Sequence, residues 1–239
     1  MLKFAGLIVC VSLFVYLGVP WIYGRCLRFL LRFRAVRRKA LVLTFDDGPG
    51  NRLTSAILKL LAENNVKATF FLLGRNIPGR ERIVRQIAEQ GHQIASHGYD
   101  HLHHWKVSPI RAIKDVTRGW QAIDTALGTK AGIYPFRPPY GKLNIVCLLY
   151  LLIHRVPLIY WTLDSSDTWS PRNKRDAQRA AISTGESGGA VVIAHDFDRE
   201  NENDNIMVLD SLRATLLMAK KVGMRVITIS ELVGNEPRN

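Results

Sequence analysis

The sequence lacks the features that mark several common protein classes. It has only three cysteines in 239 residues, Cys10, Cys26 and Cys147. This small, odd number indicates no disulfide framework, and favours a reducing compartment or a fold that needs no such cross-links. No internal repeat, low-complexity tract or linker suggests a second domain. The length fits one sizeable domain plus an appendage, and the 47% of hydrophobic residues suffices for a buried core.

Acidic residues are also few. There are 20 Asp and Glu against 33 Lys and Arg, which gives a formal net charge of +13. Such a charge can indicate nucleic-acid binding, but here seven basic residues share one short stretch beside an apolar segment: Arg25, Arg28, Arg32, Arg34, Arg37, Arg38 and Lys39. A basic run that adjoins a hydrophobic run is typical of a lipid surface. We therefore expect membrane lipids, and no nucleic acid, as partners.

The segment from Phe4 to Tyr23 contains no charged residue. It has about the 20 residues that a helix needs to span the hydrocarbon core, and Trp21 and Tyr23 suit the interface. A cleaved signal peptide fits less well, because only Lys3 precedes the apolar run and no small-x-small site follows it. Residues 1–24 are predicted to form a transmembrane or membrane-anchor helix, and a signal peptide or a partly inserted helix remains the alternative.

Residues 25–39 are predicted to form a basic amphipathic helix at the interface. Their apolar residues, Cys26, Phe29, Leu30, Phe33 and Val36, recur at helical spacing. Positive residues near a span prefer the cytoplasmic side, so the following domain is predicted to be cytoplasmic. An extracytoplasmic domain stays open, because a basic helix can also bind anionic lipids on the outer side.

From residue 40 to 239 short apolar runs alternate with helical patterns. Candidate strands are 40–45, 68–73, 93–96, 133–137, 158–163, 190–194 and 225–228; candidate helices are 54–64, 80–90, 109–127, 143–153, 176–184 and 205–222. Ser108 before Pro109 is a good helix start. Repeated βα units predict an α/β domain with a parallel sheet, either open or closed into a barrel.

Polar side chains that could take part in catalysis or metal binding follow these strands. They are Asp46, Asp47, His97, Arg137, Asp164, Asp167 and His195. In βα folds the loops after the strands build the active site, so these distant residues are expected to converge.

Two short motifs point to metal chemistry. Adjacent Asp46 and Asp47 cannot point the same way, which suits two separate tasks. His97 and His101 are four residues apart, and a helical turn would place both imidazoles on one face. Two histidines and one carboxylate leave coordination positions open, as in catalytic metal sites. Alone, each motif is more typical of an exposed turn or surface than of a metal site. The neighbouring His92, His103 and His104 are interpreted as structural or as residues that support the metal ligands.

Five motifs in order resemble the polysaccharide deacetylase family, which contains chitin, peptidoglycan and chitooligosaccharide deacetylases. They are the runs 44–49 (TFDDGP), 96–101 (SHGYDH), 137–141 (RPPYG), 164–169 (DSSDTW) and 192–195 (VIAH). The resemblance covers about residues 41–232. It implies a distorted (β/α) barrel of about seven strands, and a carbohydrate N-deacetylase that hydrolyses the N-acetyl group of an amino sugar in a polysaccharide or a lipid-linked glycan.

The resemblance also implies residue roles. Asp47, His97 and His101 match the ligands of one divalent metal ion, usually zinc and sometimes cobalt or nickel. The matching catalytic residues are Asp46 as general base, Arg137 as its partner, His195 as general acid and Asp167 as the carboxylate that orients it. Tyr140 matches the residue whose backbone N–H helps to form the oxyanion hole, and Ile193 and Trp169 match substrate-binding residues, with Ile193 lining the acetyl methyl pocket.

The sequence departs from the family pattern at two places. Gly98 stands where the family usually has Ser or Thr, and Thr168 intervenes between Asp167 and Trp169. A non-catalytic glycan-binding relative would be expected to lose Asp46 or His195, and both are present. A related esterase, deformylase or amidase with the same apparatus remains an alternative. The apolar run 143–153 and the charge bias favour a lipid-linked substrate, although a buried helix explains that run equally well.

Overall fold

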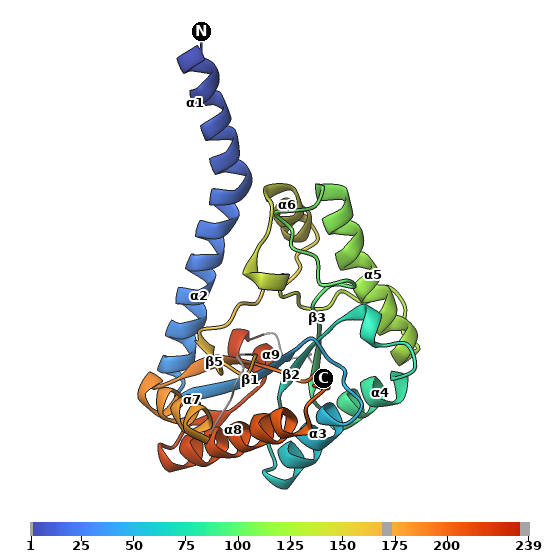
Figure 1. Cartoon of the computed structure of the whole chain (residues 1–239), viewed down its shortest axis with the longest axis vertical. Helices are drawn as coiled ribbons and strands as arrows, with labels where there is room; N and C mark the ends of the chain where they lie inside the picture. Colours follow the sequence, from blue (N-terminus) through green and yellow to red (C-terminus); the bar gives the residue numbers. More distant parts are fainter. Residues whose placement is uncertain (1, 169–173, 235–239) are drawn as a thin grey trace.

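The computed structural model describes residues 2–168 and 174–234, in which helices surround a parallel sheet and a long N-terminal helix projects from the domain (Figure 1). The sheet contains β1 (Ala40–Asp46), β2 (Thr69–Leu72), β3 (Gln93–Ser96), β4 (Leu163–Asp164), β5 (Ala190–His195) and β6 (Arg225–Val226). Its order is β3-β2-β1-β5-β4, with β6 paired to the start of β1, and all pairings are parallel. The predicted α/β class with a parallel sheet is confirmed.

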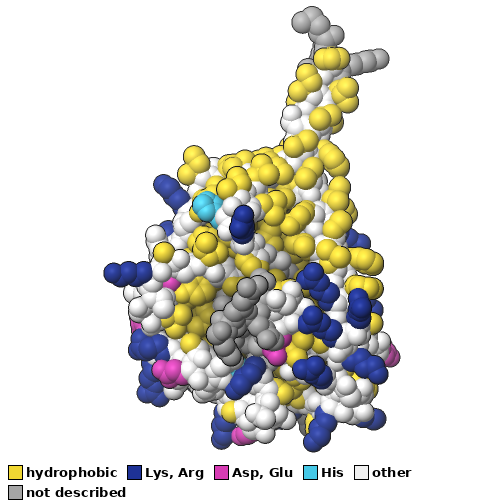
Figure 2. All heavy atoms as spheres, turned by 180° about the vertical axis from the view of Figure 1, so that it is seen from behind, with side chains coloured by type: hydrophobic (Ala, Val, Ile, Leu, Met, Phe, Trp, Pro, Cys, Tyr) yellow, Lys and Arg dark blue, Asp and Glu magenta, His cyan; other side chains and the backbone are white. Residues whose placement is uncertain are grey.

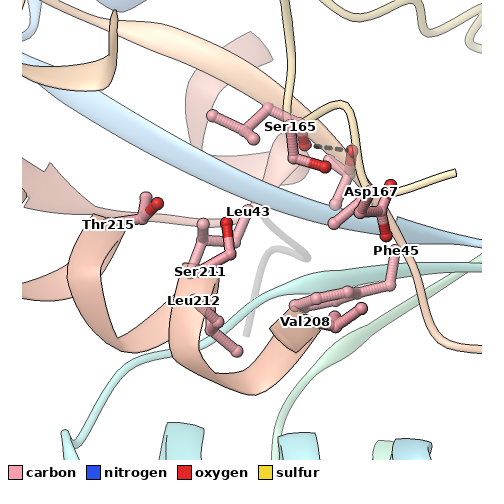
Figure 3. Close-up of a pocket in the computed structure, with 11 residues that line it drawn as sticks. Leu43, Phe45, Ser165, Asp167, Val208, Ser211, Leu212 and Thr215 are labelled. Atoms are coloured by element: carbon pink, nitrogen blue, oxygen red, sulfur yellow. Dashed lines mark hydrogen bonds between the residues drawn. The ribbon is translucent and has the colours of Figure 1, made fainter. Parts of the chain in front are cut away.

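Six of the seven described helices of the domain lie close to their predicted positions, and α9 (Ile229–Val233) was not predicted. The other six are α3 (Leu53–Glu63), α4 (Glu81–Glu89), α5 (Pro109–Leu127), α6 (Ile145–Ile153), α7 (Lys174–Ser187) and α8 (Glu202–Lys221). Ser108 caps α5 by accepting a hydrogen bond from the N–H of Arg111. Between the sheet and α8 lies a cavity of about 20 Å³, lined by residues such as Leu43, Ser165 and Ser211 (Figure 3). It has room for about one water molecule, which is too little for a sugar.

Closure of the sheet into a barrel of about seven strands is not confirmed. Within the described residues the sheet is open: five of its six strands form one path, β3-β2-β1-β5-β4, and β6 pairs only with β1. Predicted strand 133–137 is reduced to a bridge at Phe136, and predicted strand 158–163 to a bridge at Leu158 and the two residues of β4. Pro135, Pro138 and Pro157 flank these bridges, and because proline has no N–H it cannot donate to a regular ladder.

The N-terminal region forms one uninterrupted helical rod (Figure 1). It consists of α1 (Leu2–Leu13), the π-helical turn η1 (Phe14–Gly18) and α2 (Val19–Arg37). Pro20 lacks the N–H that would bond to Tyr16, and the turn before it widens accordingly. By length and composition alone, Gly6–Arg37 is apolar enough to cross a membrane, and 6% of its most apolar window is buried in the domain.

The C-terminal half of this rod belongs to the core. Leu31 and Ala35 of α2 are buried in one cluster with Val42 of β1 and Val191 of β5. The opposite face of α2 leaves apolar residues such as Phe29 exposed. The division into residues 1–24, 25–39 and 40–239 stays a prediction, since α2 runs without a break from the apolar helix into the core.

Helix α6 places a second apolar surface beside this rod, because it contacts η1. Cys147, Leu148 and Leu151 face inward, while Val146, Leu149, Leu152 and Ile153 are exposed. Figure 2 shows hydrophobic side chains that cover the projecting helix and continue over the adjoining end of the domain, with Lys and Arg gathered further from that end. Run 143–153 is thus buried on one face and leaves an apolar face exposed, and contact of that face with lipid stays a prediction.

Candidate metal and catalytic site

The register of the two central strands brings the first site residues together. Asp46 pairs with His195 and Thr44 with Ile193 across β1 and β5. Because side chains alternate along a strand, these four residues lie on one face of the sheet. The sequence places a carboxylate and an imidazole at the same sheet edge, as predicted from the strand ends.

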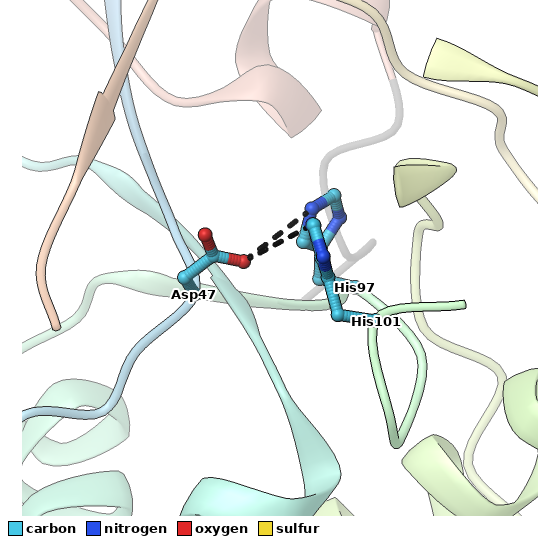
Figure 4. A group of neighbouring side chains, drawn as sticks. All are labelled: Asp47, His97 and His101. Carbon is cyan, nitrogen blue, oxygen red and sulfur yellow. Dashed lines mark ion pairs between the residues drawn. The ribbon is translucent and has the colours of Figure 1, made fainter. Parts of the chain in front are cut away.

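Asp47, His97 and His101 form a compact group of potential metal ligands (Figure 4). Oδ1 of Asp47 lies 3.7 Å from Nε2 of His97 and 3.5 Å from Nε2 of His101. These separations are too long for hydrogen bonds, and Oδ1 of Asp47 is buried without any hydrogen-bond partner in the described residues. Ligands of a tetrahedral ion with bonds of about 2.1 Å stand about 3.4 Å apart, so the group fits a zinc-like ion.

The two histidines are held in the form that binds metal. Nδ1 of His97 lies 2.7 Å from the carbonyl oxygen of Arg137 and donates to it, which leaves the lone pair of Nε2 directed at Asp47. Burial lowers the pKa of His97 to about 3, and burial also lowers the pKa of His101. Both imidazoles are therefore neutral at physiological pH, as coordination requires.

The expectation of a helical turn between His97 and His101 is wrong. Residues 97–101 form a loop, in which Gly98 has φ 85° and His101 has φ 58°. A Cβ on Gly98 would lie 2.3 Å from Oδ2 of Asp115, and Asp115 in turn accepts a 2.7 Å hydrogen bond from the N–H of Asp100. This packing explains why glycine stands where Ser or Thr was expected: a side chain has no room beside Asp115.

Asp47, His97 and His101 are referred to below as the metal group. Asp46 lies next to it and belongs to a buried ion pair. Nη1 of Arg137 donates to Oδ1 of Asp46 at 2.6 Å, and both side chains are almost fully buried. The guanidinium also lies over the ring of Phe71, 3.9 Å from its centroid. Burial raises the pKa of Asp46, and the charge of Arg137 opposes that rise. Oδ2 of Asp46 lies 3.7 Å from Nε2 of His97, so it stands beside one of the potential metal-ligand atoms.

His195 and Asp167 form a second buried pair of ionisable side chains. Oδ1 of Asp167 lies 2.7 Å from Nδ1 of His195, and Oδ2 accepts the backbone N–H of His195 at 2.7 Å. Burial acts to lower the pKa of His195, but the charge and hydrogen bond of Asp167 outweigh it and raise the pKa to about 9. His195 is therefore an imidazolium at neutral pH, and its Nε2 carries a proton that can be donated.

Sequence reasoning missed three residues that hold this site. Arg199 donates to the carboxylate of Asp167 at 3.1 Å and to its carbonyl at 3.0 Å. The carboxylate of Asp198 accepts the N–H groups of Asn51, Arg52 and Leu53 at 2.7–3.0 Å, which fixes the start of α3. The side chain of Asn76 donates to the carbonyl of Asp47 at 2.8 Å. The charged run 195–200 was the available signal for the first two; Asn76 carried none.

The candidate substrate-binding residues lie in different parts of the structure. Tyr140 lies in the turn Pro139–Gly141 with φ 57° and ψ 8°, and its ring packs 4.6 Å from that of His101. Ile193 is buried on β5. Trp169 lies outside the described residues. Asp164, singled out as a strand-end residue, is exposed and lines a different cleft from the metal group.

An open cleft of about 370 Å³ reaches the metal group. It is lined by Asp47 and His101 together with Arg75, Asn76 and Phe197. Its volume is in the range of small-molecule sites. A ligand in this cleft would contact two of the three potential metal ligands, Asp47 and His101.

Comparisons with known proteins show what the chain is similar to. A sequence model described as polysaccharide deacetylase matches residues 34–151. The peptidoglycan-N-acetylglucosamine deacetylase PgdA of Listeria monocytogenes is 32% identical over 205 residues, which cover 85% of this chain but 41% of that protein. A chitooligosaccharide deacetylase of Rhizobium leguminosarum bv. phaseoli is 32% identical over 186 residues, 73% of this chain and 80% of that protein. The crystal structure of a peptidoglycan N-acetylglucosamine deacetylase superposes with a TM-score of 0.73 at 27% identity, over 84% of this chain and 91% of the other.

Proposed function

The chain belongs to the polysaccharide deacetylase family, and on that premise we propose that it hydrolyses the N-acetyl group of an acetylated amino sugar and releases acetate. One observation carries the proposal: the carboxylate–arginine pair, the metal-ligand group and the imidazolium–carboxylate pair meet at one sheet edge. The named activities of the relatives, on peptidoglycan N-acetylglucosamine and on chitooligosaccharides, support the same class of substrate.

The residues divide the reaction between them. An acetamide is a poor electrophile, and a divalent ion held by Asp47, His97 and His101 would polarise its carbonyl and lower the pKa of water. Zinc fits the ligand set, and cobalt or nickel is compatible with it. Asp46, fixed by Arg137, is positioned to take a proton from the attacking water.

Departure of the amine requires a proton, and His195 supplies it. The amine anion is too basic to leave, so donation from Nε2 of His195 to the sugar nitrogen lets the C–N bond break. Asp167 stabilises the imidazolium before that donation. The backbone N–H of Tyr140 is the proposed donor to the developing oxyanion.

The direct test is acetate release from defined N-acetylated oligosaccharides by the metal-loaded protein. We expect stoichiometric acetate and a free amine, both lost in Asp46→Asn, while the surface variant Asp210→Asn retains both. Release of formate, or of acetate from O-acetyl sugars alone, would favour the deformylase or esterase alternative. Glycan binding without any turnover would favour a non-catalytic relative.

We also propose that the N-terminal helix anchors the enzyme in a membrane with the domain in the cytoplasm. The apolar helix and the exposed face of α6 support the anchor, and the positive-inside rule supports the orientation. A reporter that fluoresces only in the cytoplasm, fused to Asn239, should fluoresce. A dark fusion together with an active extracytoplasmic reporter would place the domain outside and favour an external polysaccharide over a lipid-linked sugar.

A further inference from the structure

A second cleft, of about 400 Å³, lies between α2 and the segment that leads into β4. Arg25, Arg28 and Arg32 of α2 form one wall, and Trp161, Thr162 and Asp164 contribute to the other. We refer to it as the arginine cleft. None of these residues belongs to the metal group or to the acid and base pairs.

The charges of the arginine cleft are not balanced. Among the described residues no carboxylate pairs with any of its three arginines, and Nε of Arg28 is buried without a hydrogen-bond partner. The single acid, Asp164, directs Oδ1 to the N–H of Ser166 at 2.7 Å. Because Nε of Arg28 has no exposed surface, a ligand would bind the remaining N–H groups of the three guanidiniums, and an anion there would balance their charge.

Arg28 is also held in position. Its guanidinium lies 4.5 Å from the ring centroid of Trp161 and 5.1 Å from that of Tyr160. Aromatic rings fix the plane of a guanidinium while its N–H groups stay available. A planar fork of this kind suits the paired oxygens of a phosphate.

The arginine cleft adjoins the catalytic turn. A Cβ built on Gly141 would lie 2.8 Å from Nη2 of Arg28 and 3.1 Å from the ring of Trp161. Gly141 directly follows Tyr140, whose ring contacts His101. Trp161 also approaches Arg137, with 5.9 Å between the ring centroid and Cζ. The arginine cleft and the metal group therefore lie on either side of the turn Pro139–Gly141.

The position of the arginine cleft along the N-terminal rod indicates from which side a ligand would approach. The arginines begin on α2 directly after the apolar run that ends at Tyr23, and the exposed face of α6 lies beside the same part of the rod. An anion bound there is presented at the level where a bilayer surface would lie.

We propose that the arginine cleft binds the phosphate or diphosphate group that joins an amino sugar to a membrane lipid, so that the enzyme deacetylates a glycosyl phospholipid. This inference rests on the proposed deacetylase function and narrows its substrate class. The same chemistry could be offered by the phosphate headgroups of bulk anionic lipid, which would aid anchoring without selecting a substrate.

The test uses the full chain in nanodiscs of zwitterionic phosphatidylcholine and compares its activity on two substrates. One is N-acetylglucosaminyl diphosphate on a short polyprenol, and the other is a neutral chitooligosaccharide. Arg28→Gln and Arg32→Gln should lower the ratio of kcat/KM for the diphosphate substrate to that for the neutral one by about tenfold or more, mainly through KM. Arg34→Gln, an equal loss of charge on α2 outside the arginine cleft, should leave the ratio unchanged.

Other outcomes overturn the inference. An equal loss on both substrates assigns Arg28 a structural role. A ratio unchanged in Arg28→Gln, with vesicles of phosphatidylglycerol bound more weakly by Arg28→Gln and Arg34→Gln alike, assigns the arginines to bulk headgroups. Wild-type protein that prefers the neutral oligosaccharide contradicts the phosphate site but leaves the deacetylase function intact.

A binding measurement separates failure of the inference from failure of the proposed function. Calorimetry with the soluble probe N-acetylglucosamine 1-diphosphate needs no turnover. Binding that is lost in Arg28→Gln but kept in Arg34→Gln supports the arginine cleft even if neither substrate is hydrolysed, whereas absence of binding by the wild type overturns it.

Discussion

The carboxylate of Asp167 accepts two hydrogen bonds from one residue, His195: one from its backbone N–H and one from its ring Nδ1, each at 2.7 Å. This double contact fixes the plane of the imidazole and places its remaining proton on Nε2. Arg199 in turn fixes Asp167. The acid of the proposed reaction is thus positioned through two successive contacts.

This arrangement predicts the alkaline limb of the pH profile. The acid is protonated His195, so turnover is full below its pKa and is lost as pH rises through it. The pKa is about 9 with Asp167 as partner, and a cation bound by Asp47 would lower it by repulsion. In Asp167→Asn we expect a further shift of the limb in kcat/KM to lower pH. An unmoved limb in this variant, with normal metal content, would assign the limb to another group.

Asp46→Asn should remove most turnover while metal content stays near normal. General base catalysis contributes about 10²–10⁴-fold, so kcat should fall within that range. The bound metal and the rate of acetate release are measured on the same preparation. If Asp46→Asn lost the metal and Asp47→Asn kept it, the assignment of the two adjacent carboxylates would be reversed.

His101→Ala and Asp47→Asn should each lower bound metal strongly, because a site with three protein ligands cannot lose one without a large loss of affinity. Elemental analysis after dialysis against a weak chelator measures the effect. His154→Ala, which changes an exposed histidine directly after the end of α6, is the matched control. Full occupancy in His97→Ala/His101→Ala would contradict the metal site.

Gly98→Ser should destabilise the protein by about 1–3 kcal/mol and lower metal affinity, because φ is 85° and the new Cβ meets Asp115. Thermal unfolding in the absence and presence of metal measures both effects. Asp115→Ala in the same chain removes the collision and should restore part of the loss. A fully stable single variant would show that the loop rearranges freely.

A chain that starts at residue 38 should unfold at lower temperature than one that starts at residue 21. The shorter chain loses Leu31 and Ala35, whose burial covers Val42 and Val191, and burial of one leucine contributes about 1.5–3 kcal/mol. Thermal unfolding of both purified chains tests this. Equal stability would show that α2 is only attached to the core and does not complete it.

Strands and helices with strong apolar periodicity were predictable within a few residues, as for α5 and β3. The positions of Asp46 and His195 followed from the strand ends, because parallel strands present their carboxyl ends at one edge. The family resemblance supplied the pairing of Arg137 with Asp46, which no local pattern encodes.

What the sequence did not reveal depends on contacts between distant segments. The loop conformation at Gly98 is set by Asp115, which lies on α5, and the short bridges at Phe136 and Leu158 reflect nearby prolines that interrupt pairing. Arg199 and Asn76 act through one or two hydrogen bonds each, and such contacts have no periodicity to detect.

The continuous rod formed by α1, η1 and α2 has a consequence for how substrate is found. At 1.5 Å per residue, its 36 residues extend about 54 Å without a break in the helix, and its C-terminal part packs into the core through Leu31 and Ala35. With α1 in a bilayer, the active site can neither swing outward nor be lowered on a tether, so it samples one thin layer parallel to the membrane. Collision with molecules diffusing in that layer is then a two-dimensional search, while glycan held far above the surface never enters the reach of Asp46.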